Sequence, residues 1–335
     1  MSDNNVPQFQ WVEKWGKNTQ SKKSLHGWAH PGMSITSDNR LVTCDSGESR
    51  ILVFSTDGVL EDSWDGNFVD AHGITVTEES DEELIWIADN GSKRLPDYDY
   101  EYPPGAENIS GRVFKVKFGG DEVTELVFPT HKEYANIRYS PTSVSVDEHR
   151  HGGQGDIWVS DGYGASLVHR YDSSGKHNLT IDGTEGAGRF DCPHGIIVDR
   201  RNSRPELYVA DRGNARVQVF DLEGNYLRTF GTGFLSSPSG FVRLGRYMVI
   251  AELKSRLTII DKDDTFSGYV FPGESHVRTN GWPNETTPGK RVQRPSKLNK
   301  REFNSPHGIT SDKDGNLYVS EWFIGGRITK LKLLQ

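Results

Sequence analysis

A phrase containing His-Gly-Ile recurs three times in this chain of 335 residues, and it restricts the fold more than any other feature. The copies are Ala71-His72-Gly73-Ile74, Pro193-His194-Gly195-Ile196 and Pro306-His307-Gly308-Ile309. Each copy opens a β-rich run that ends at a small acidic turn, and three further segments fit the same template without the histidine. Repeats with a period of ~40–50 residues are typical of propellers and solenoids.

The clearest copy of the repeat covers residues 192–231. It contains four runs of alternating or β-branched residues separated by turn residues, which predicts a four-stranded antiparallel meander. Six such copies account for nearly all of the chain. The sequence therefore predicts an all-β fold, a six-bladed β-propeller, as a single domain over residues 1–335.

The two ends of the chain are predicted to meet in one blade. The sixth repeat stops at Gln335 without a fourth strand, whereas residues 9–16 imitate the fourth strand of the clearest copy. We expect this N-terminal strand to complete the last blade and close the ring. Closure would protect strand edges that could otherwise pair with other chains.

Histidine occupies one position of every second repeat. In chain order the six equivalent residues are Pro31, His72, Thr142, His194, Ser239 and His307. In a closed ring of six blades the three imidazoles lie about 120° apart around the axis. Three neutral histidines with an open fourth position are a common pattern for catalytic zinc. A repeat consensus that merely packs would favour histidine at all six positions or at scattered ones, so the alternation favours a metal site. His30 falls one residue out of register, and we expect it to lie outside this site.

Further candidates lie on the same face of the predicted propeller. The end of the second strand of a blade shares a face with the start of the first, which puts Tyr163 and Arg212 near the histidines. A tyrosine close to a cation can act as a base, and an arginine can bind a carboxylate in a two-point contact. Insertions at residues 91–110 and 274–304 map to this face as well.

The second strands also end in acids that we interpret as structural. Asp89, Asp161 and Asp211 occupy equivalent turns. We expect their carboxylates to accept backbone N–H groups of the turn rather than to take part in catalysis.

Composition excludes several classes of partner. A net charge of −8 argues against a nucleic-acid surface, which needs many lysines and arginines. No apolar run is long enough to cross a bilayer, and residues 1–6 lack the apolar core of a signal peptide. Cys44 and Cys192 are expected to be free thiols, which suits a reducing compartment. We therefore expect a cytoplasmic protein, a monomer or weak oligomer, with no membrane partner.

Several of these phrases resemble a known family. Asp161-Gly162-Tyr163, the Pro-His-Gly phrases and the run from Ala210 to Phe220 are similar to NHL-repeat propellers, specifically to peptidyl-α-hydroxyglycine α-amidating lyase. The similarity covers residues 30–335. It implies that His72, His194 and His307 hold a catalytic zinc, that Tyr163 is the catalytic tyrosine, and that Arg212 contacts the substrate.

The chain departs from the family pattern at three places. Ser46 stands where a second substrate arginine is expected, and Gly164 replaces a cysteine, so the family's disulfides are absent. Gly308 stands where an acid is expected, which leaves the family's structural calcium uncertain.

The leading hypothesis is a metal-dependent lyase that cleaves the C–N bond of a carbinolamide-type α-hydroxy acid, such as an α-hydroxyglycine or a ureidoglycolate-like compound. Its partner would be a small molecule bearing a carboxylate, and its metal zinc, with copper or iron possible. A hydratase or oxidase could use the same three histidines. A non-catalytic NHL-repeat platform for protein binding is the alternative from another class, and a calcium-dependent lactone hydrolase is a third.

Overall fold

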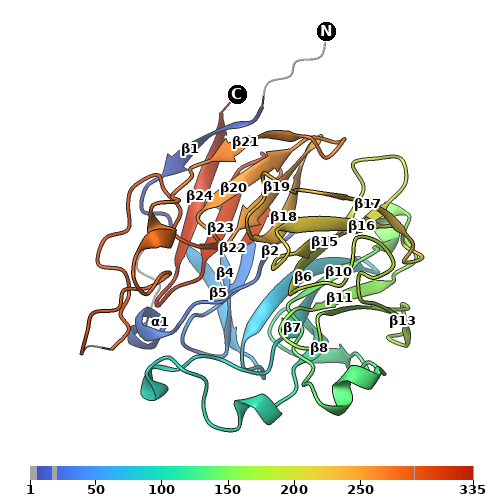
Figure 1. Ribbon diagram of the computed structural model, residues 1–335, viewed down its shortest axis with the longest axis horizontal. Helices are drawn as coiled ribbons and strands as arrows, with labels where there is room; N and C mark the ends of the chain where they lie inside the picture. The colour runs from blue at the N-terminus through green and yellow to red at the C-terminus, as the bar shows by residue number, and fades with distance from the viewer. Residues whose placement is uncertain (1–5, 17–20, 290, 335) are drawn as a thin grey trace.

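The computed structural model describes residues 6–16, 21–289 and 291–334. Its strands form six four-stranded antiparallel sheets arranged around a central axis (Figure 1). The first strands of the sheets contact one another in the order β2, β6, β10, β14, β18, β22 and back to β2. The predicted six-bladed β-propeller is confirmed.

The strand bounds follow the repeats. The first three blades consist of β2 (Met33–Ile35), β3 (Leu41–Cys44), β4 (Arg50–Phe54) and β5 (Leu60–Asp65); β6 (Ala71–Glu79), β7 (Glu82–Asp89), β8 (Arg112–Lys117) and β9 (Glu122–Glu125); and β10 (Ser143–Val146), β11 (Ile157–Asp161), β12 (Leu167–Tyr171) and β13 (His177–Ile181). The last three consist of β14 (Pro193–Asp199), β15 (Glu206–Asp211), β16 (Arg216–Phe220) and β17 (Tyr226–Phe230); β18 (Pro238–Leu244), β19 (Tyr247–Glu252), β20 (Arg256–Ile260) and β21 (Phe266–Val270); and β22 (Pro306–Ser311), β23 (Leu317–Glu321), β24 (Arg327–Leu334) and β1 (Gln8–Val12).

Helical segments are few and short. They are α1 (Lys22–His26) and the 3₁₀ turns η1 (Pro96–Tyr98), η2 (Ala106–Asn108), η3 (Lys132–Ala135), η4 (His149–His151) and η5 (His276–Arg278). Among the described residues, none of the helices has the length and apolar character needed to cross a bilayer. The sequence predicts that residues 1–6 lack the apolar core of a signal peptide. Of these six residues, the structure describes only Val6.

The N-terminal strand closes the ring as expected. The blue strand β1 lies against the red strand β24 in Figure 1, and the two pair antiparallel from Gln8 opposite Leu334 to Val12 opposite Lys330. The strand is shorter than the predicted 9–16, because residues 13–16 turn away from β24. Trp15 then packs against aromatic rings of another part of the core.

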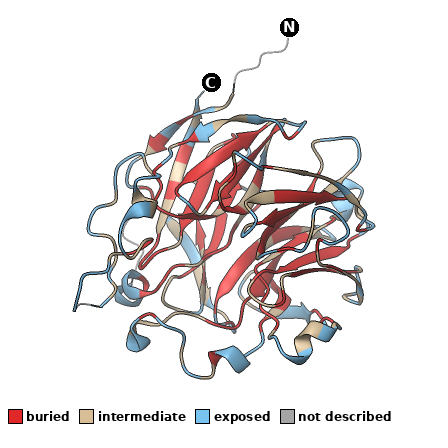
Figure 2. Cartoon of the chain, viewed as in Figure 1, coloured by how far each residue is buried: buried red, intermediate tan, exposed pale blue. Residues whose placement is uncertain are grey.

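Each blade packs between two neighbours, so its second strand is buried on both faces. All five residues of β11 are buried, and Trp158 packs against Ile196 and Phe220 of the next blade. Figure 2 shows this buried interior in red beneath exposed loops. Close packing of this kind makes the blades a rigid support for side chains at their ends.

The acids at the ends of the second strands have the structural role that the sequence predicted. Asp161 accepts the backbone N–H groups of Ser140 and Ala165, both at 2.7 Å. Asp89 accepts three backbone N–H groups, and Asp211 accepts that of Asp191. These bonds fix the turns, and the turn after Asp161 carries Tyr163.

The insertion at residues 91–110 lies between β7 and β8, as expected, and is tied to the next blade. Arg138 donates to the carbonyl oxygens of Asn90, Ala106 and Ile109 and, at 2.7 Å, to the hydroxyl of Ser92. One guanidinium thus holds both ends of the insertion above the propeller face.

Ring closure generates a testable prediction about Trp11. This side chain of β1 packs on Phe271 and Phe303 with ring centroids 5.3 and 5.0 Å apart. We expect Trp11→Ala to lower the free energy of unfolding by about 3–5 kcal/mol, as other buried tryptophans do. Gln10→Ala, an exposed position of the same strand, should change it by less than about 0.5 kcal/mol. Denaturant unfolding measures both, and equal stability of the two variants would contradict the closing role of β1.

Candidate metal centre

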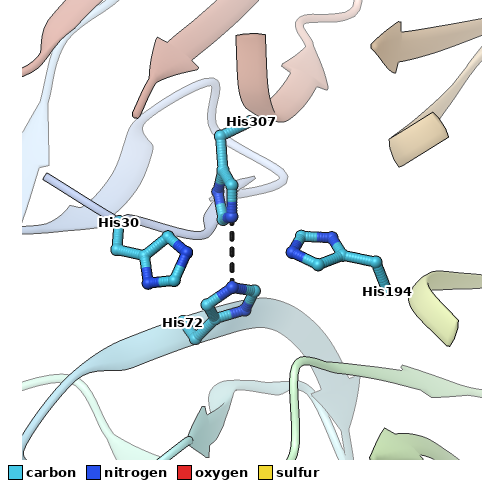
Figure 3. Close-up of side chains that lie close together, drawn as sticks. All are labelled: His30, His72, His194 and His307. Carbon is cyan, nitrogen blue, oxygen red and sulfur yellow. Dashed lines mark hydrogen bonds between the residues drawn. The ribbon is translucent and has the colours of Figure 1, made fainter. Parts of the chain in front are cut away.

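The three predicted histidines meet on the propeller axis. His72, His194 and His307 each occupy the second position of a first strand, β6, β14 or β22, and each is 2% exposed. Together with His30 they offer ring nitrogens that all lie within 4.8 Å of one another. Figure 3 shows the four rings converging, with the Nε2 atoms of His72 and His307 3.1 Å apart.

The expectation that His30 lies outside this group is wrong. His30 precedes β2, so its side chain is not placed by the strand register but by the segment that approaches the blade. Its Nδ1 lies 3.1 Å from a carboxylate oxygen of Asp70, and its Nε2 faces the cluster. The available sequence signal was a histidine directly before Pro31-Gly32, the first copy of the repeat phrase.

The repeats that lack histidine orient the histidines. The Nδ1 atoms of His72, His194 and His307 lie 2.6, 2.8 and 3.4 Å from the carbonyl oxygens of Thr142, Ser239 and Pro31, respectively. A carbonyl oxygen only accepts hydrogen bonds, so each Nδ1 carries the hydrogen. Each Nε2 therefore presents a lone pair to the axis, which is how second-layer partners commonly prepare histidines for a metal.

The glycine after each histidine allows this close approach. A Cβ on Gly195 would lie 2.5 Å from the carbonyl oxygen of Ser239, and one on Gly308 would lie 2.8 Å from that of Pro31. Any larger residue would push apart the backbones that the Nδ1 hydrogen bonds connect. The His-Gly pair is thus one geometric unit.

Burial keeps the cluster uncharged. Loss of solvent, followed by neighbouring positive groups, lowers the pKa of His72, His194 and His307 well below the usual value, and burial lowers that of His30. The hydroxyl of Tyr163 lies 2.9 to 3.2 Å from the Nε2 atoms of His30, His194 and His72, but it has a single hydrogen to donate.

A bound metal ion fits these residues. Four ring nitrogens lie within 4.8 Å of one another, and two of them are only 3.1 Å apart. Two nitrogens each bound to a tetrahedral zinc at ~2.0–2.1 Å would lie about 3.3 Å apart. Imidazole donors suit zinc, copper and iron, so the donor set leaves the metal open.

Tyr163 and Arg212 lie together beside the histidines, as the sequence predicted. The guanidinium of Arg212 is 3.4 Å from the Tyr163 hydroxyl and 3.1 Å from the sulfur of Cys192. Among the described residues, no carboxylate pairs with it. Burial raises the pKa of Tyr163 above its usual range, and the charge of Arg212 opposes this.

A cavity of about 140 Å³ adjoins the centre on this face. Its lining includes His30, Tyr163 and Arg212 and, from the insertion at residues 91–110, Lys93. Lys93 and its partner Asp70 were not predicted from the sequence, because neither belongs to the repeat template. On the opposite side of the histidines, the first strands enclose an axial channel of about 570 Å³.

Comparison with known proteins supports the repeat assignment. No family model matches the chain. It is 30% identical over 223 residues to NHL repeat-containing protein 3 of Homo sapiens, which covers 63% of this chain and 58% of that protein. Peptidyl-glycine alpha-amidating monooxygenase A of Xenopus laevis is 24% identical over 288 residues, covering 82% of this chain and 26% of that protein. The chain thus spans less than two thirds of these relatives.

Solved structures agree on the fold. A streptogramin B lyase superposes with a TM-score of 0.54 at 14% identity, covering 98% of both chains. A gluconolactonase from Xanthomonas campestris superposes with a TM-score of 0.53 at 15% identity, covering 99% of this chain and 96% of that one. At these identities the likeness shows the fold alone.

Metal content is the first test of the centre. We expect the protein purified without added metal to carry about one transition-metal ion. His72→Ala, His194→Ala and His307→Ala should each remove most of it, because His30 precedes β2, is held by Asp70 and does not replace an imidazole that a first strand aims at the axis. His30→Ala should keep it, since the triad remains, and His177→Ala on the outer strand β13 is the matched control. Elemental analysis with full occupancy in all three triad variants would rule out the metal centre.

A second test uses the pH dependence of the metal-free protein. Because the folded state lowers the pKa of these histidines, the unfolded chain binds more protons below pH ~6.5. Stability should therefore fall as the pH drops below ~6.5, by up to about 1.4 kcal/mol per pH unit for each histidine. Urea unfolding of chelator-treated protein measures the slope, and His194→Asn should reduce it by about one proton. A stability that stays constant between pH 6.5 and 5 would refute buried neutral histidines.

Proposed function

We propose that this NHL-repeat six-bladed β-propeller, which resembles the peptidylglycine α-amidating enzymes, is a metal-dependent lyase. Its substrate would be a carbinolamide-type α-hydroxy acid, an N-acyl α-hydroxyglycine or a ureidoglycolate-like compound, whose C–N bond it cleaves. The observation that carries this proposal is the position of the Tyr163 hydroxyl. It lies within hydrogen-bonding distance of three converging histidine nitrogens and 3.4 Å from an arginine.

Arg212 is suited to bind the substrate carboxylate. A half-buried guanidinium without a carboxylate partner among the described residues is an electrostatic cost unless an anion compensates it. Its planar fork matches a carboxylate in two parallel hydrogen bonds. With the carboxylate held there, the α-carbon next to it would lie close to Tyr163.

Tyr163 is suited to take the proton of the α-hydroxyl. A metal ion held by His72, His194 and His307 would supply Lewis acidity towards that hydroxyl group. As Tyr163 accepts the proton, the oxygen's electron pair forms the carbonyl, the C–N bond breaks, and its electron pair leaves with the nitrogen. The proton on Tyr163 then passes to the nitrogen, which restores the tyrosinate, so the products are a glyoxylate-type acid and an amide or urea, without redox change.

The acidity of Tyr163 decides whether it can serve as a base. Burial, more than any other cause, holds the pKa of this hydroxyl above its usual range, so the hydroxyl is protonated at neutral pH. The nearby charge of Arg212 lowers the pKa, and a cation among the histidine nitrogens that contact the hydroxyl acts in the same direction. The proposed base therefore requires the metal as well as the arginine.

Two other functions fit less well. A calcium-dependent lactone hydrolase needs oxygen ligands, whereas the group of possible ligands on the axis consists of four imidazoles. A protein-binding platform does not require four histidine nitrogens close together on the propeller axis. A hydratase or oxidase could use the same centre, and turnover products distinguish these reactions from C–N cleavage.

The proposed base is tested by Tyr163→Phe. In metal-loaded protein we expect kcat on N-acetyl-α-hydroxyglycine or ureidoglycolate to fall by ~10²–10⁴, since a positioned proton acceptor is lost. Metal content should stay unchanged. Tyr269→Phe, which removes a hydroxyl on the outer strand β21, is the control. Turnover of Tyr163→Phe at the wild-type rate would refute the lyase mechanism even if the metal is present.

The carboxylate site is tested by Arg212→Lys. An ammonium cannot reproduce the two-point contact, so KM should rise by at least ~10-fold while the metal is retained. Replacing the substrate carboxylate by a carboxamide should weaken binding to the wild type and affect the variant little. Arg40→Lys is the control, because Arg40 forms an ion pair with Asp38 at the protein surface. If the carboxamide loses equal affinity for both proteins, Arg212 does not bind the carboxylate.

A further inference from the structure

Lys93 brings a donor into the cavity from the insertion at residues 91–110. Its Nζ lies 3.3 Å from the nearer carboxylate oxygen of Asp70 and 3.5 Å from the carbonyl oxygen of Asp45. Its side chain is 10% exposed and lines the cavity. An ammonium carries three hydrogens, so two described contacts leave one for a ligand.

The charge balance indicates what kind of group Lys93 can bind. Asp70, which is 1% exposed, pairs with Lys93 and also holds His30 at 3.1 Å. The charge of Lys93 is therefore already compensated, whereas that of Arg212 is not. A second carboxylate at Lys93 would face the buried charge of Asp70. A neutral carbonyl oxygen would instead receive a charge-assisted hydrogen bond without this repulsion.

The neighbouring walls of the cavity are flat and aromatic. The rings of Trp28 and Trp322 lie 5.3 Å apart, and the ring of Trp322 is 6.0 Å from that of His30. The guanidinium of Arg94 lies over Trp28 at 5.2 Å and over Tyr102 at 4.7 Å. Such faces favour a planar group over a branched aliphatic one.

The subsite is held in place before any ligand arrives. Tyr100 of the insertion donates to the carbonyl oxygen of His26 at 3.0 Å and packs on Trp28, while Arg138 fixes both ends of the insertion. The whole cavity, which Arg212 and Tyr163 also line, has a volume of about 140 Å³, so it has room for a compact substrate.

We propose that Lys93 and the aromatic faces of Trp28 and Trp322 form a subsite for the nitrogen-bearing half of the substrate. This half is a compact planar acyl or ureido group whose carbonyl oxygen accepts a hydrogen bond from Lys93 while its plane stacks on the tryptophans. The inference rests on the proposed function, because it assumes that Arg212 holds the carboxylate. It specifies the substrate as a small N-acyl or N-carbamoyl compound rather than a peptide.

Two matched ligands test the subsite by equilibrium binding. N-carbamoylglycine and guanidinoacetate have the same planar shape and the same carboxylate, but the second carries a cationic NH₂ group in place of the carbonyl oxygen. Neither has an α-hydroxyl, so neither is turned over. Calorimetry on zinc-loaded wild type should show N-carbamoylglycine binding at least ~10-fold more tightly, as expected for a hydrogen bond to a charged group. Equal affinities, or no binding of either ligand, would overturn the proposal.

Substitutions assign this preference to its residues. Lys93→Met should bring the two affinities within ~3-fold of each other, with metal content unchanged. Lys115→Met is the matched control, because this lysine also pairs with a carboxylate beside a tryptophan, but on β8 away from the cavity. Trp322→Leu should weaken both ligands by a similar factor of ~5 or more, and Trp64→Leu on β5 should weaken neither. A preference that survives Lys93→Met would overturn the role of Lys93.

The binding test of the subsite and the turnover test of the lyase reaction can give independent results. If the protein shows the Lys93-dependent preference but never cleaves a carbinolamide, the subsite is confirmed and the lyase reaction is refuted. If the protein cleaves a carbinolamide but binds the two ligands equally, both as wild type and as Lys93→Met, the lyase reaction is confirmed and the subsite is refuted.

Discussion

The arrangement on the axis depends on one kind of hydrogen bond, from the Nδ1 of a histidine to a backbone carbonyl of the next blade. Histidine repeats alternate with repeats that supply this acceptor, so the ring divides into three equal pairs. Each bond fixes the tautomer and aims the Nε2 lone pair inward. The glycine after each histidine lets the carbonyl approach, which links the repeat phrase to the chemistry of the site.

In this propeller the buried strands provide rigidity, whereas the turns and one insertion carry the reactive side chains beside the histidines. Second strands that are buried on both faces hold the first strands around the axis, and buried acids such as Asp161 fix the turns at their ends. On this support the turns present Tyr163 and Arg212, and the insertion at residues 91–110 presents Lys93. Because the histidines come from three blades, the centre depends on the closed ring, whose last blade includes β1.

The repeat period made much of this predictable. It places Tyr163 and Arg212 relative to the histidines, since every blade repeats one strand geometry, and the structure brings these residues together. His30 could not be placed in this way, because it precedes β2 and is aimed by Asp70, a residue of the following blade. Lys93 depends on the path of an insertion that Arg138 ties down across blades. Such contacts do not recur from one repeat to the next, so they cannot be predicted from the repeat pattern.

The blade geometry prepares imidazole nitrogens for a metal. X-ray absorption spectroscopy of the metal in the purified protein tests it most directly, because it reports the type, number and distance of the ligands. We predict at least three imidazole nitrogens around the metal, at ~2.0–2.1 Å if the metal is zinc. A metal surrounded by oxygen ligands alone, without imidazole scattering, would contradict it.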